Sequence, residues 1–208
     1  MVPVYANGLG VENRPARGRD TPENLIIKLK ICLVGDPAVG KTSLVRRYVK
    51  DQFDDEYLKT VGAKIAKKTL VIPWNGAEIR VDMILWDIAG MRGKDSILKR
   101  DYLYGTQGVL AVCDATDDKT IASVGDWIAV VKDLVGDVPI QVVINKSEIE
   151  SATPEPGWSV LSDGTSCIRA SAKTGDNVER AFYDLAKRVV TERMAARAVS
   201  VERDLSRR

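Results

Sequence analysis

The stretch Gly35-Asp-Pro-Ala-Val-Gly-Lys-Thr42 follows a strand-like run, Ile26 to Val34, and opens a segment with helical spacing, Lys41 to Lys50. A glycine-rich turn between a strand and a helix exposes backbone N–H groups, which bind phosphate oxygens at the helix N-terminus. In this pattern the Lys41 ammonium reaches the β- and γ-phosphates, and the Thr42 hydroxyl is a ligand for Mg²⁺. The stretch therefore predicts a nucleoside triphosphate site. The alternative is a glycine loop that binds no ligand.

The rest of the chain alternates apolar, β-branched runs with helical patterns. The Asn75-Gly76 pair between two of these runs indicates a β-hairpin. Near-continuous apolar strands that alternate with helices are typical of a parallel sheet covered on both faces. We therefore predict an α/β fold: a mostly parallel six-stranded sheet with one antiparallel edge strand and helices on both faces. The expected strands are 26–34, 65–72, 78–86, 108–114, 138–145 and 167–170, and the expected helices are 41–50, 121–135 and 178–189.

The composition excludes several classes of protein. The 208 residues are 45% hydrophobic and 29% charged, which is ordinary for a globular domain. Lys and Arg number 31 against 29 Asp and Glu, and a net charge of +2 is too balanced to suggest nucleic-acid binding. There is no histidine, so catalysis by histidine is excluded. The three cysteines are too sparse for a metal cluster, and no apolar run is long enough to span a membrane.

Both ends of the chain differ from its middle. Residues 1–24 are rich in proline, glycine and arginine and are expected to form a flexible arm. Its arginines leave a weak surface-anchoring role open. Residues 25–198 are expected to form one domain, followed by a tail at 199–208. Val2 excludes N-myristoylation, and the final Leu-Ser-Arg-Arg has no nearby cysteine to prenylate, so no lipid anchor is expected.

Three further motifs stand where strands end, at the edge where open α/β sheets bind ligands. In Trp86-Asp87-Ile88-Ala89-Gly90, the Asp87 carboxylate is placed to hold the water shell of Mg²⁺, and the Gly90 N–H can approach a γ-phosphate. An Asp at a strand end also has a simpler role as a turn former. Asn145-Lys146-Ser147-Glu148 ends a later strand, and Ser171-Ala172-Lys173 follows the last short strand.

In their order and spacing, these motifs resemble those of Ras-superfamily small GTPases, and most of all the Rab branch. The resemblance extends over about residues 25–195. It is carried by KICLVGDPAVGKTSLVRRYV, DQFDDEYLKTVGAKI, ILWDIAG, GVLAVCDATD, VVINKSE and ASAKTGDNVERAF. It implies a small G-domain of the P-loop NTPase class, which binds GTP and GDP with Mg²⁺, hydrolyses GTP and acts as a molecular switch for a protein partner.

The resemblance also implies roles for single residues. Phe53 resembles the aromatic residue that lies against the guanine, and Tyr57 the residue that closes over the phosphates. Thr60 resembles the threonine that binds Mg²⁺ only when the γ-phosphate is present; its alternative is a capping or loop threonine. Asn145 would pin the phosphate loop and touch the base, Lys146 would lay its stem on the base, and the Ala172 N–H would meet the guanine O6.

The expected nucleotide-binding residues are Asp36, Pro37, Ala38, Val39, Gly40, Lys41, Thr42, Ser43, Phe53, Tyr57, Thr60, Gly90, Asn145, Lys146, Glu148, Ser171, Ala172 and Lys173. The expected Mg²⁺ ligands, direct or through water, are Thr42, Thr60 and Asp87, and the expected catalytic residues are Lys41, Thr60, Gly90 and Met91.

Two departures from the family pattern bear on chemistry. Met91 stands where most of the family has a glutamine that orients the attacking water, and a thioether is at best a weak acceptor. We therefore expect slow hydrolysis, unless a partner or another residue takes the role and Met91 only packs. Glu148 replaces an aspartate that pairs with guanine. It keeps both acceptor oxygens, so guanine preference is expected to survive; the alternative is a solvent-facing Glu148 with relaxed specificity.

Two smaller departures concern local structure. Residues 151–163, where the family has a helix, contain Pro154, Pro156 and Gly157 and are expected to form a loop with a short helical turn. Pro37 lies beside the γ-phosphate position without an N–H to offer, and we interpret it as tolerated.

Partners follow from the resemblance: an effector, a GTPase-activating protein and an exchange protein. The expected location is the cytoplasm, with recruitment to a membrane surface by a partner left open. Two other functions also stay open. A non-hydrolysing GTP-bound interaction module is favoured by Met91, and a P-loop ATPase or kinase only by Glu148.

Overall fold

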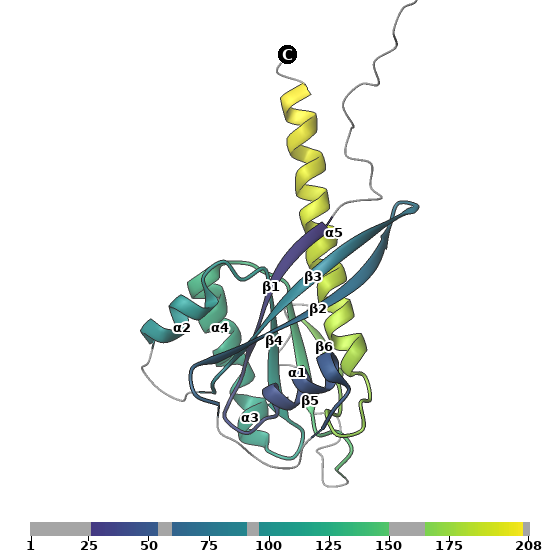
Figure 1. Ribbon diagram of the computed structural model, residues 1–208. Helices are drawn as coiled ribbons and strands as arrows, with labels where there is room; N and C mark the ends of the chain where they lie inside the picture. Colours follow the sequence, from purple (N-terminus) through teal and green to yellow (C-terminus); the bar gives the residue numbers. More distant parts are fainter. Residues whose placement is uncertain (1–25, 54–59, 91–95, 150–164, 206–208) are drawn as a thin grey trace, which may run out of the picture.

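The computed structural model describes residues 26–53, 60–90, 96–149 and 165–205, in which strands alternate with helices (Figure 1). Strands such as GVLAVCD and IQVVIN are apolar along nearly their whole length because both of their faces are buried. In chain order the elements are β1 (Ile26–Val34), α1 (Lys41–Lys50), β2 (Ala63–Trp74), β3 (Ala77–Ile88), α2 (Ser96–Leu103), β4 (Gly108–Asp114), α3 (Asp118–Ala122), α4 (Val124–Val135), β5 (Ile140–Asn145), β6 (Ser166–Arg169) and α5 (Val178–Leu205).

The strands form one sheet in the order β2-β3-β1-β4-β5-β6. β2 pairs antiparallel with β3, and all other neighbouring strands pair in parallel. The β2–β3 hairpin turns at Asn75 and Gly76, whose φ values of 47° and 79° suit the two-residue turn that these residue types favour. The predicted fold class is confirmed, and both hairpin strands are longer than the expected runs 65–72 and 78–86.

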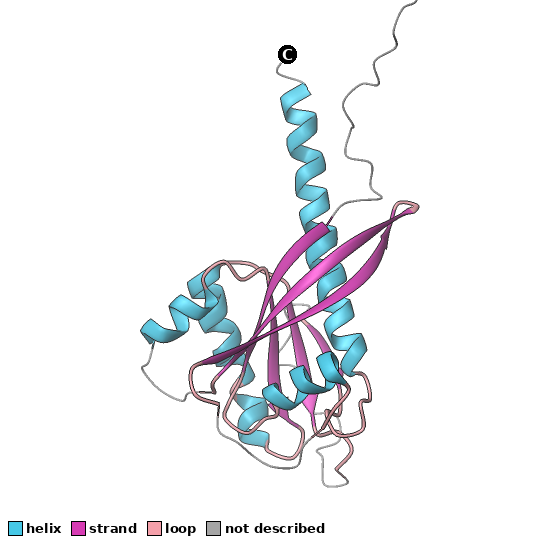
Figure 2. Ribbon diagram, in the orientation of Figure 1, coloured by secondary structure: helices cyan, strands magenta, loops and turns pink. Residues whose placement is uncertain are grey.

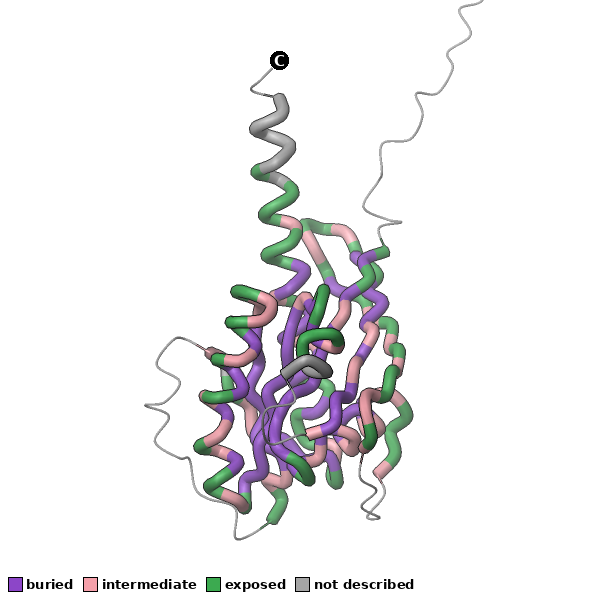
Figure 3. The backbone as a smooth tube through the Cα atoms, turned by 90° about the vertical axis from the view of Figure 1, so that its left-hand side faces the viewer, coloured by how far each residue is buried: buried purple, intermediate pink, exposed green. Residues whose placement is uncertain are grey.

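Helices cover both faces of the sheet (Figure 2). On one face α1 and α5 enclose a core cluster in which the rings of Tyr48 and Phe182 stack, with centroids 4.1 Å apart. On the other face α4 contributes Trp127 and Val131 to a second cluster. The central strands are buried between these layers, and outward-facing helix surfaces are exposed (Figure 3). The C-terminal ends of the parallel strands gather at one edge of the sheet, at the lower end of Figure 1.

Three elements differ from the expected ones. The predicted helix 121–135 is two helices, α3 and α4, which meet at Ser123. Helix α2 was not predicted. Helix α5 continues past residue 198, where we placed the end of the domain, and it extends beyond the sheet toward the end that carries the hairpin turn (Figure 1).

The predictions for the arm 1–24 and the loop 151–163 concern residues outside those described. Among the residues that the structure describes, the helices are all too short or too polar to cross a lipid bilayer.

Candidate functional site

The phosphate loop predicted from the sequence lies between β1 and α1, and its lysine is buried. The Lys41 side chain is only 6% exposed, and its Nζ donates to the carbonyls of Gly35 at 2.8 Å and Asp36 at 2.9 Å. Burial lowers the pKa of Lys41 to about 8, against the opposing effects of Asp87 and Asp36. A cationic amine held on backbone carbonyls in a buried loop is suited to bind an anion such as phosphate.

The Asp36 carboxylate contacts residues around the start of α4. Its Oδ1 accepts from Trp127 Nε1 and its Oδ2 from Ser123 Oγ, both at 3.1 Å. Asp36 therefore ties the phosphate loop to the start of α4. Pro37 and Ala38 form the exposed tip of the loop, where Ala38 has a left-handed φ of 63°.

Three oxygen-bearing side chains meet beside Lys41. The Thr42 Oγ1 donates to Asp87 Oδ2 at 2.5 Å and lies 2.9 Å from the Oγ1 of Thr60. The second carboxylate oxygen of Asp87 is buried and has no hydrogen-bond partner among the residues that the structure describes. Burial raises the pKa of Asp87, and the Thr42 hydrogen bond and Lys41 oppose that rise. Two hydroxyls and a buried carboxylate with an unused oxygen form a donor set of the hard type that Mg²⁺ prefers.

The segment after β3 packs directly against the phosphate loop. A Cβ added to Gly90 would lie 2.5 Å from the Pro37 nitrogen, closer than a real contact allows, so only glycine fits here. The neighbouring Ala89 N–H donates to the Gly62 carbonyl at 2.9 Å. This bond joins the segment that carries Gly90 to the segment that carries Thr60.

Asn145 connects the phosphate loop to the Ser171-Ala172-Lys173 motif. Its Nδ2 donates to the Val39 carbonyl at 2.9 Å, and its Oδ1 accepts from the Ala172 N–H at 3.0 Å. A Cβ on Gly40, where φ is 95°, would lie 2.1 Å from the same Nδ2, so the amide fills the space that a side chain at Gly40 would need. Two predicted groups of residues, distant in the sequence, therefore meet through one buried side chain.

Asp114 is a site residue that the sequence analysis missed. It ends β4 beside Asn145 in the register, and its Oδ2 pairs with Lys146 Nζ at 2.5 Å. Burial alone would raise the pKa of Asp114, but hydrogen bonds from Lys146 and Thr116 outweigh it and hold the pKa below its ordinary value. An acidic residue at the end of a buried strand was the signal used for Asp87, and it applies equally here.

The remaining predicted residues take varied positions. Ser171 is fully buried and its Oγ accepts from the Thr174 N–H at 2.9 Å, while Lys173 and Glu148 are exposed. Phe53 packs against the first core cluster, and Ser43 is half-buried in the first turn of α1. Tyr57 and Met91 lie outside the described residues.

Comparison with known proteins decides the family. The sequence profile of the Ras family matches residues 30–191, which contain all the residues just described. The chain belongs to the Ras family. It is thus a small GTPase with a GTP-binding P-loop fold, as the motifs predicted.

Its relatives include several Rab proteins. The chain is 34% identical to the Ras-related protein SEC4 of Saccharomyces cerevisiae over 163 residues, which are 76% of this chain and 74% of that protein. It is 34% identical to the Ras-related protein Rab-21 of Geodia cydonium over 169 residues, 79% of this chain and 72% of that protein. It is 30% identical to Homo sapiens Rab-8B over 168 residues, 78% and 79% of the two chains. The predicted likeness to the Rab branch is confirmed.

Proposed function

We propose that this Ras-family protein binds GTP and GDP with Mg²⁺ at the edge of the sheet described above and hydrolyses GTP slowly as it switches. The observation that carries the proposal is the meeting of Thr42, Thr60 and Asp87 next to the buried Lys41 ammonium. A cation donor set beside a cationic phosphate-binding residue matches a magnesium-bound phosphate chain.

Thr42, Thr60 and Asp87 are the residues that would hold Mg²⁺. The unpartnered buried oxygen of Asp87 supports this assignment, since it has an unused acceptor that a metal-bound water can satisfy. When bound, Mg²⁺ neutralises charge on the phosphate oxygens. Thr60 would bind Mg²⁺ from the loop that leads into β2, and the order of that loop would then depend on the γ-phosphate.

On the phosphates, the chain acts by positioning and charge. Lys41 would exchange its bonds to the Gly35 and Asp36 carbonyls for phosphate oxygens, and backbone N–H groups from Ala38 to Ser43 would line the phosphate chain. The Gly90 N–H would approach the γ-phosphate from the segment packed on the loop. The Ala89–Gly62 hydrogen bond then couples both segments, which supports a joint signal to an effector.

Slow hydrolysis follows from Met91. Its thioether cannot orient a water as a glutamine amide does, so intrinsic hydrolysis falls below the roughly 10⁻⁴ s⁻¹ of glutamine-bearing relatives. A GTPase-activating protein would then supply the missing group. The alternative is a GTP-bound interaction module that does not hydrolyse its ligand, and Met91 is the residue that favours it.

On the base, Asn145, Lys146, Glu148 and Ala172 would select guanine. The contacts that support this role are the two hydrogen bonds of Asn145 and the ion pair that directs Lys146. Phe53 would lie against the base, and Tyr57 would close over the phosphates. Exchange proteins and effectors are the expected partners, acting in the cytoplasm, with any membrane reached through a partner.

The direct test is chromatography of the nucleotide that acid releases from freshly purified protein. GDP supports guanine binding with working hydrolysis, and GTP supports the non-hydrolysing alternative. An adenine nucleotide would overturn the base assignment.

A second test measures single-turnover GTP hydrolysis in Met91→Gln, with Met91→Leu as the matched control. We expect glutamine to raise the rate at least about tenfold, toward that of the family, and leucine to leave it unchanged. Equal rates in all three proteins would show that another residue takes the glutamine role.

A further inference from the structure

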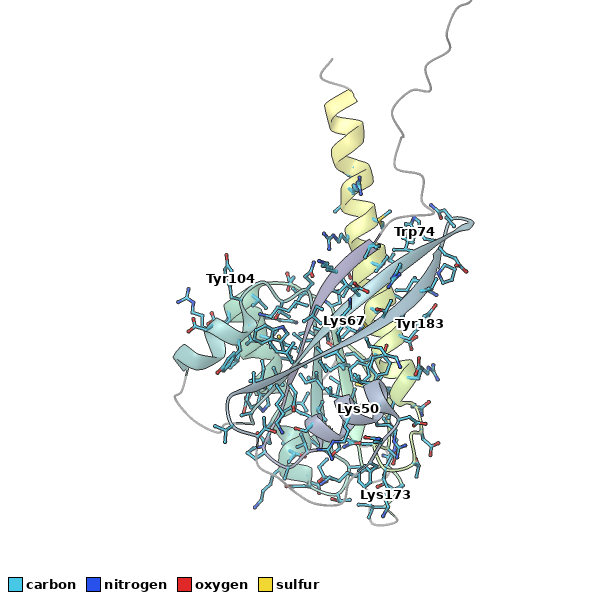
Figure 4. The ribbon with its side chains drawn as sticks, viewed as in Figure 1. Lys50, Lys67, Trp74, Tyr104, Lys173 and Tyr183 are labelled. Atoms are coloured by element: carbon cyan, nitrogen blue, oxygen red, sulfur yellow. The ribbon has the colours of Figure 1, made fainter. Side chains whose placement is uncertain are left out.

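Arg47 links the helix that begins at the phosphate loop to the loop that contains Ala172. It lies on α1, and its side chain is only 17% exposed. Its Nε donates to the Ala172 carbonyl at 2.9 Å, and its Nη2 donates to the Lys173 carbonyl at 2.5 Å. In Figure 4, Lys173 lies at the lower edge of the molecule, below the helix that carries Lys50. The guanidinium thus spans two consecutive carbonyls of one loop.

Only arginine suits this position. Its planar guanidinium has five N–H donors in a fixed geometry, and three of its nitrogens are used here. The third, Nη1, donates to Asp51 Oδ1 at 3.0 Å, and this carboxylate is 91% exposed. The ion pair at the surface contributes little, whereas the two bonds to the loop carbonyls join separate elements of the fold.

Ala172 is therefore held from two sides. Its carbonyl accepts from Arg47 Nε, and its N–H donates to Asn145 Oδ1. The Nδ2 of the same Asn145 donates to the Val39 carbonyl of the phosphate loop. The residue itself is 2% exposed. Hydrogen bonds between Ser171 and the residues Thr174, Gly175 and Asp176 give the loop its own turn, and the Arg47 and Asn145 contacts attach that turn to α1 and to β5.

We propose that Arg47 is a positioning residue for guanine recognition: it holds the 171–173 loop where the Ala172 N–H, which donates to Asn145 Oδ1 in this structure, reaches the base O6 once it exchanges that hydrogen bond. The inference rests on the guanine-nucleotide function proposed above and deepens it. Arg47 would act on the base only through the backbone of Ala172 and Lys173, whose carbonyls it binds.

The experiment pairs a change in the protein with a change in the ligand. Dissociation rates of GDP and of 2-aminopurine riboside diphosphate, which lacks O6, are measured from the full chain and from Arg47→Met. Methionine keeps an aliphatic stem but removes every donor. We expect GDP to dissociate about tenfold faster or more, and the rate for the analogue to change less than about twofold.

Two further variants sharpen the result. Asp51→Asn removes the ion pair but leaves both carbonyl bonds, so its GDP rate should stay within about twofold of the parent. Arg47→Lys keeps the charge and can reach one carbonyl, so it should give an intermediate rate; it also keeps the test available if Arg47→Met does not fold.

The contrary outcomes are distinct. Equal acceleration of both nucleotides with a lowered Tm would make Arg47 a general structural residue, and an unchanged GDP rate would remove it from recognition altogether. If the parent protein binds no guanine nucleotide, that result contradicts the proposed function itself, and the inference about Arg47 is overturned together with it.

Discussion

The proposed phosphate side of the site, around Lys41, and the proposed base side, around Lys146 and Ala172, are built in different ways. On the phosphate side Lys41, Thr42 and Asp87 are buried or half-buried, and they contact one another or the loop directly. On the base side, side chains from separate elements hold the loops: Asp114 pairs with Lys146, and Arg47 reaches the Ala172 carbonyl. On the phosphate side, nucleotide binding would depend on a few groups, whereas on the base side it would depend on several bridging side chains.

The difference predicts how each side tolerates change. A lost phosphate contact has no neighbouring group to replace it, whereas a lost base-side bridge leaves others in place. The clearest departure from the family among the described residues, Glu148, accordingly lies on the base side and is exposed.

The largest effect is expected from Lys41→Ala. The change removes the buried ammonium, and hydrogen bonds to charged groups contribute about 1.5–3 kcal/mol each. GDP affinity, measured by calorimetry, should fall about 100-fold or more. Lys50→Ala, on the exposed face of the same helix, is the control and should bind as the parent does. A loss of GDP affinity below about tenfold would contradict the view that a few groups carry most of the phosphate binding.

The second effect is a pH dependence of the same residue. The pKa of Lys41 is lowered to about 8 by burial, so the amine is charged below pH 8 and neutral above it. Phosphate favours the charged form, so GDP affinity should fall about twofold between pH 7 and 8 and about fivefold between pH 8 and 9. Titration at pH 7, 8 and 9 measures this, and Lys41→Ala should lack the slope. A flat profile in the parent would mean that the lysine stays charged.

Asp114→Asn tests the distributed base side and should have a moderate effect. Without the ion pair Lys146 is less well directed, and GDP dissociation should accelerate about tenfold. The folded pKa of Asp114 is lowered, so the stability it contributes is complete above about pH 4 and is lost as pH falls through the folded pKa. The variant should therefore be about 1 kcal/mol less stable at pH 7, and equal to the parent in strong acid.

A smaller effect is expected from Glu148→Asp. Shortening the side chain by one methylene restores the length found in the family, so the ratio of GDP to IDP affinity should rise about threefold. The control is the same ratio in Asp51→Asn, which should not move. An unchanged ratio in Glu148→Asp would indicate that Glu148 faces solvent in the complex as well.

The smallest effect concerns the rate at which the three cysteines react. They lie on β1, β4 and β6, three of the strands that lead to the site. Cys32 on β1 is buried, and burial raises the pKa of its thiol to about 11; burial likewise raises the pKa of Cys113 to about 12. Cys167 on β6 is exposed. A maleimide at pH 7 should label Cys167 within minutes and the other two only after unfolding, because the thiolate is the reactive form. Rapid labelling of Cys32 would show that the phosphate side opens.

Sequence alone predicted the mostly parallel six-stranded sheet with its antiparallel hairpin, and the order of the six strands along the chain. These depend on periodicity and on glycine at fixed positions, both of which are local signals. The strand β4, apolar throughout, and the turn at Asn75-Gly76 are examples.

What escaped prediction depends on contacts between distant segments. The pairing of Asp114 with Lys146 requires β4 and β5 to lie side by side, and the Arg47 contacts require α1 to meet the 171–173 loop. Helix α2 was missed because SILKRDYL has weak helical periodicity, and the break at Ser123 because its backbone stays nearly helical. The roles assigned to individual site residues remain predictions.

Gly40, which has no side chain, links the two sides of the site through Asn145. The Asn145 amide occupies the volume that any Cβ at Gly40 would need, and in doing so it holds Val39 on one side and Ala172 on the other. Any substitution at Gly40 would displace the amide and so release the phosphate loop and the base loop together. A change at this one position would therefore be pleiotropic: it would weaken both sides at once, although Lys41 and Arg47 keep their own contacts to the two loops.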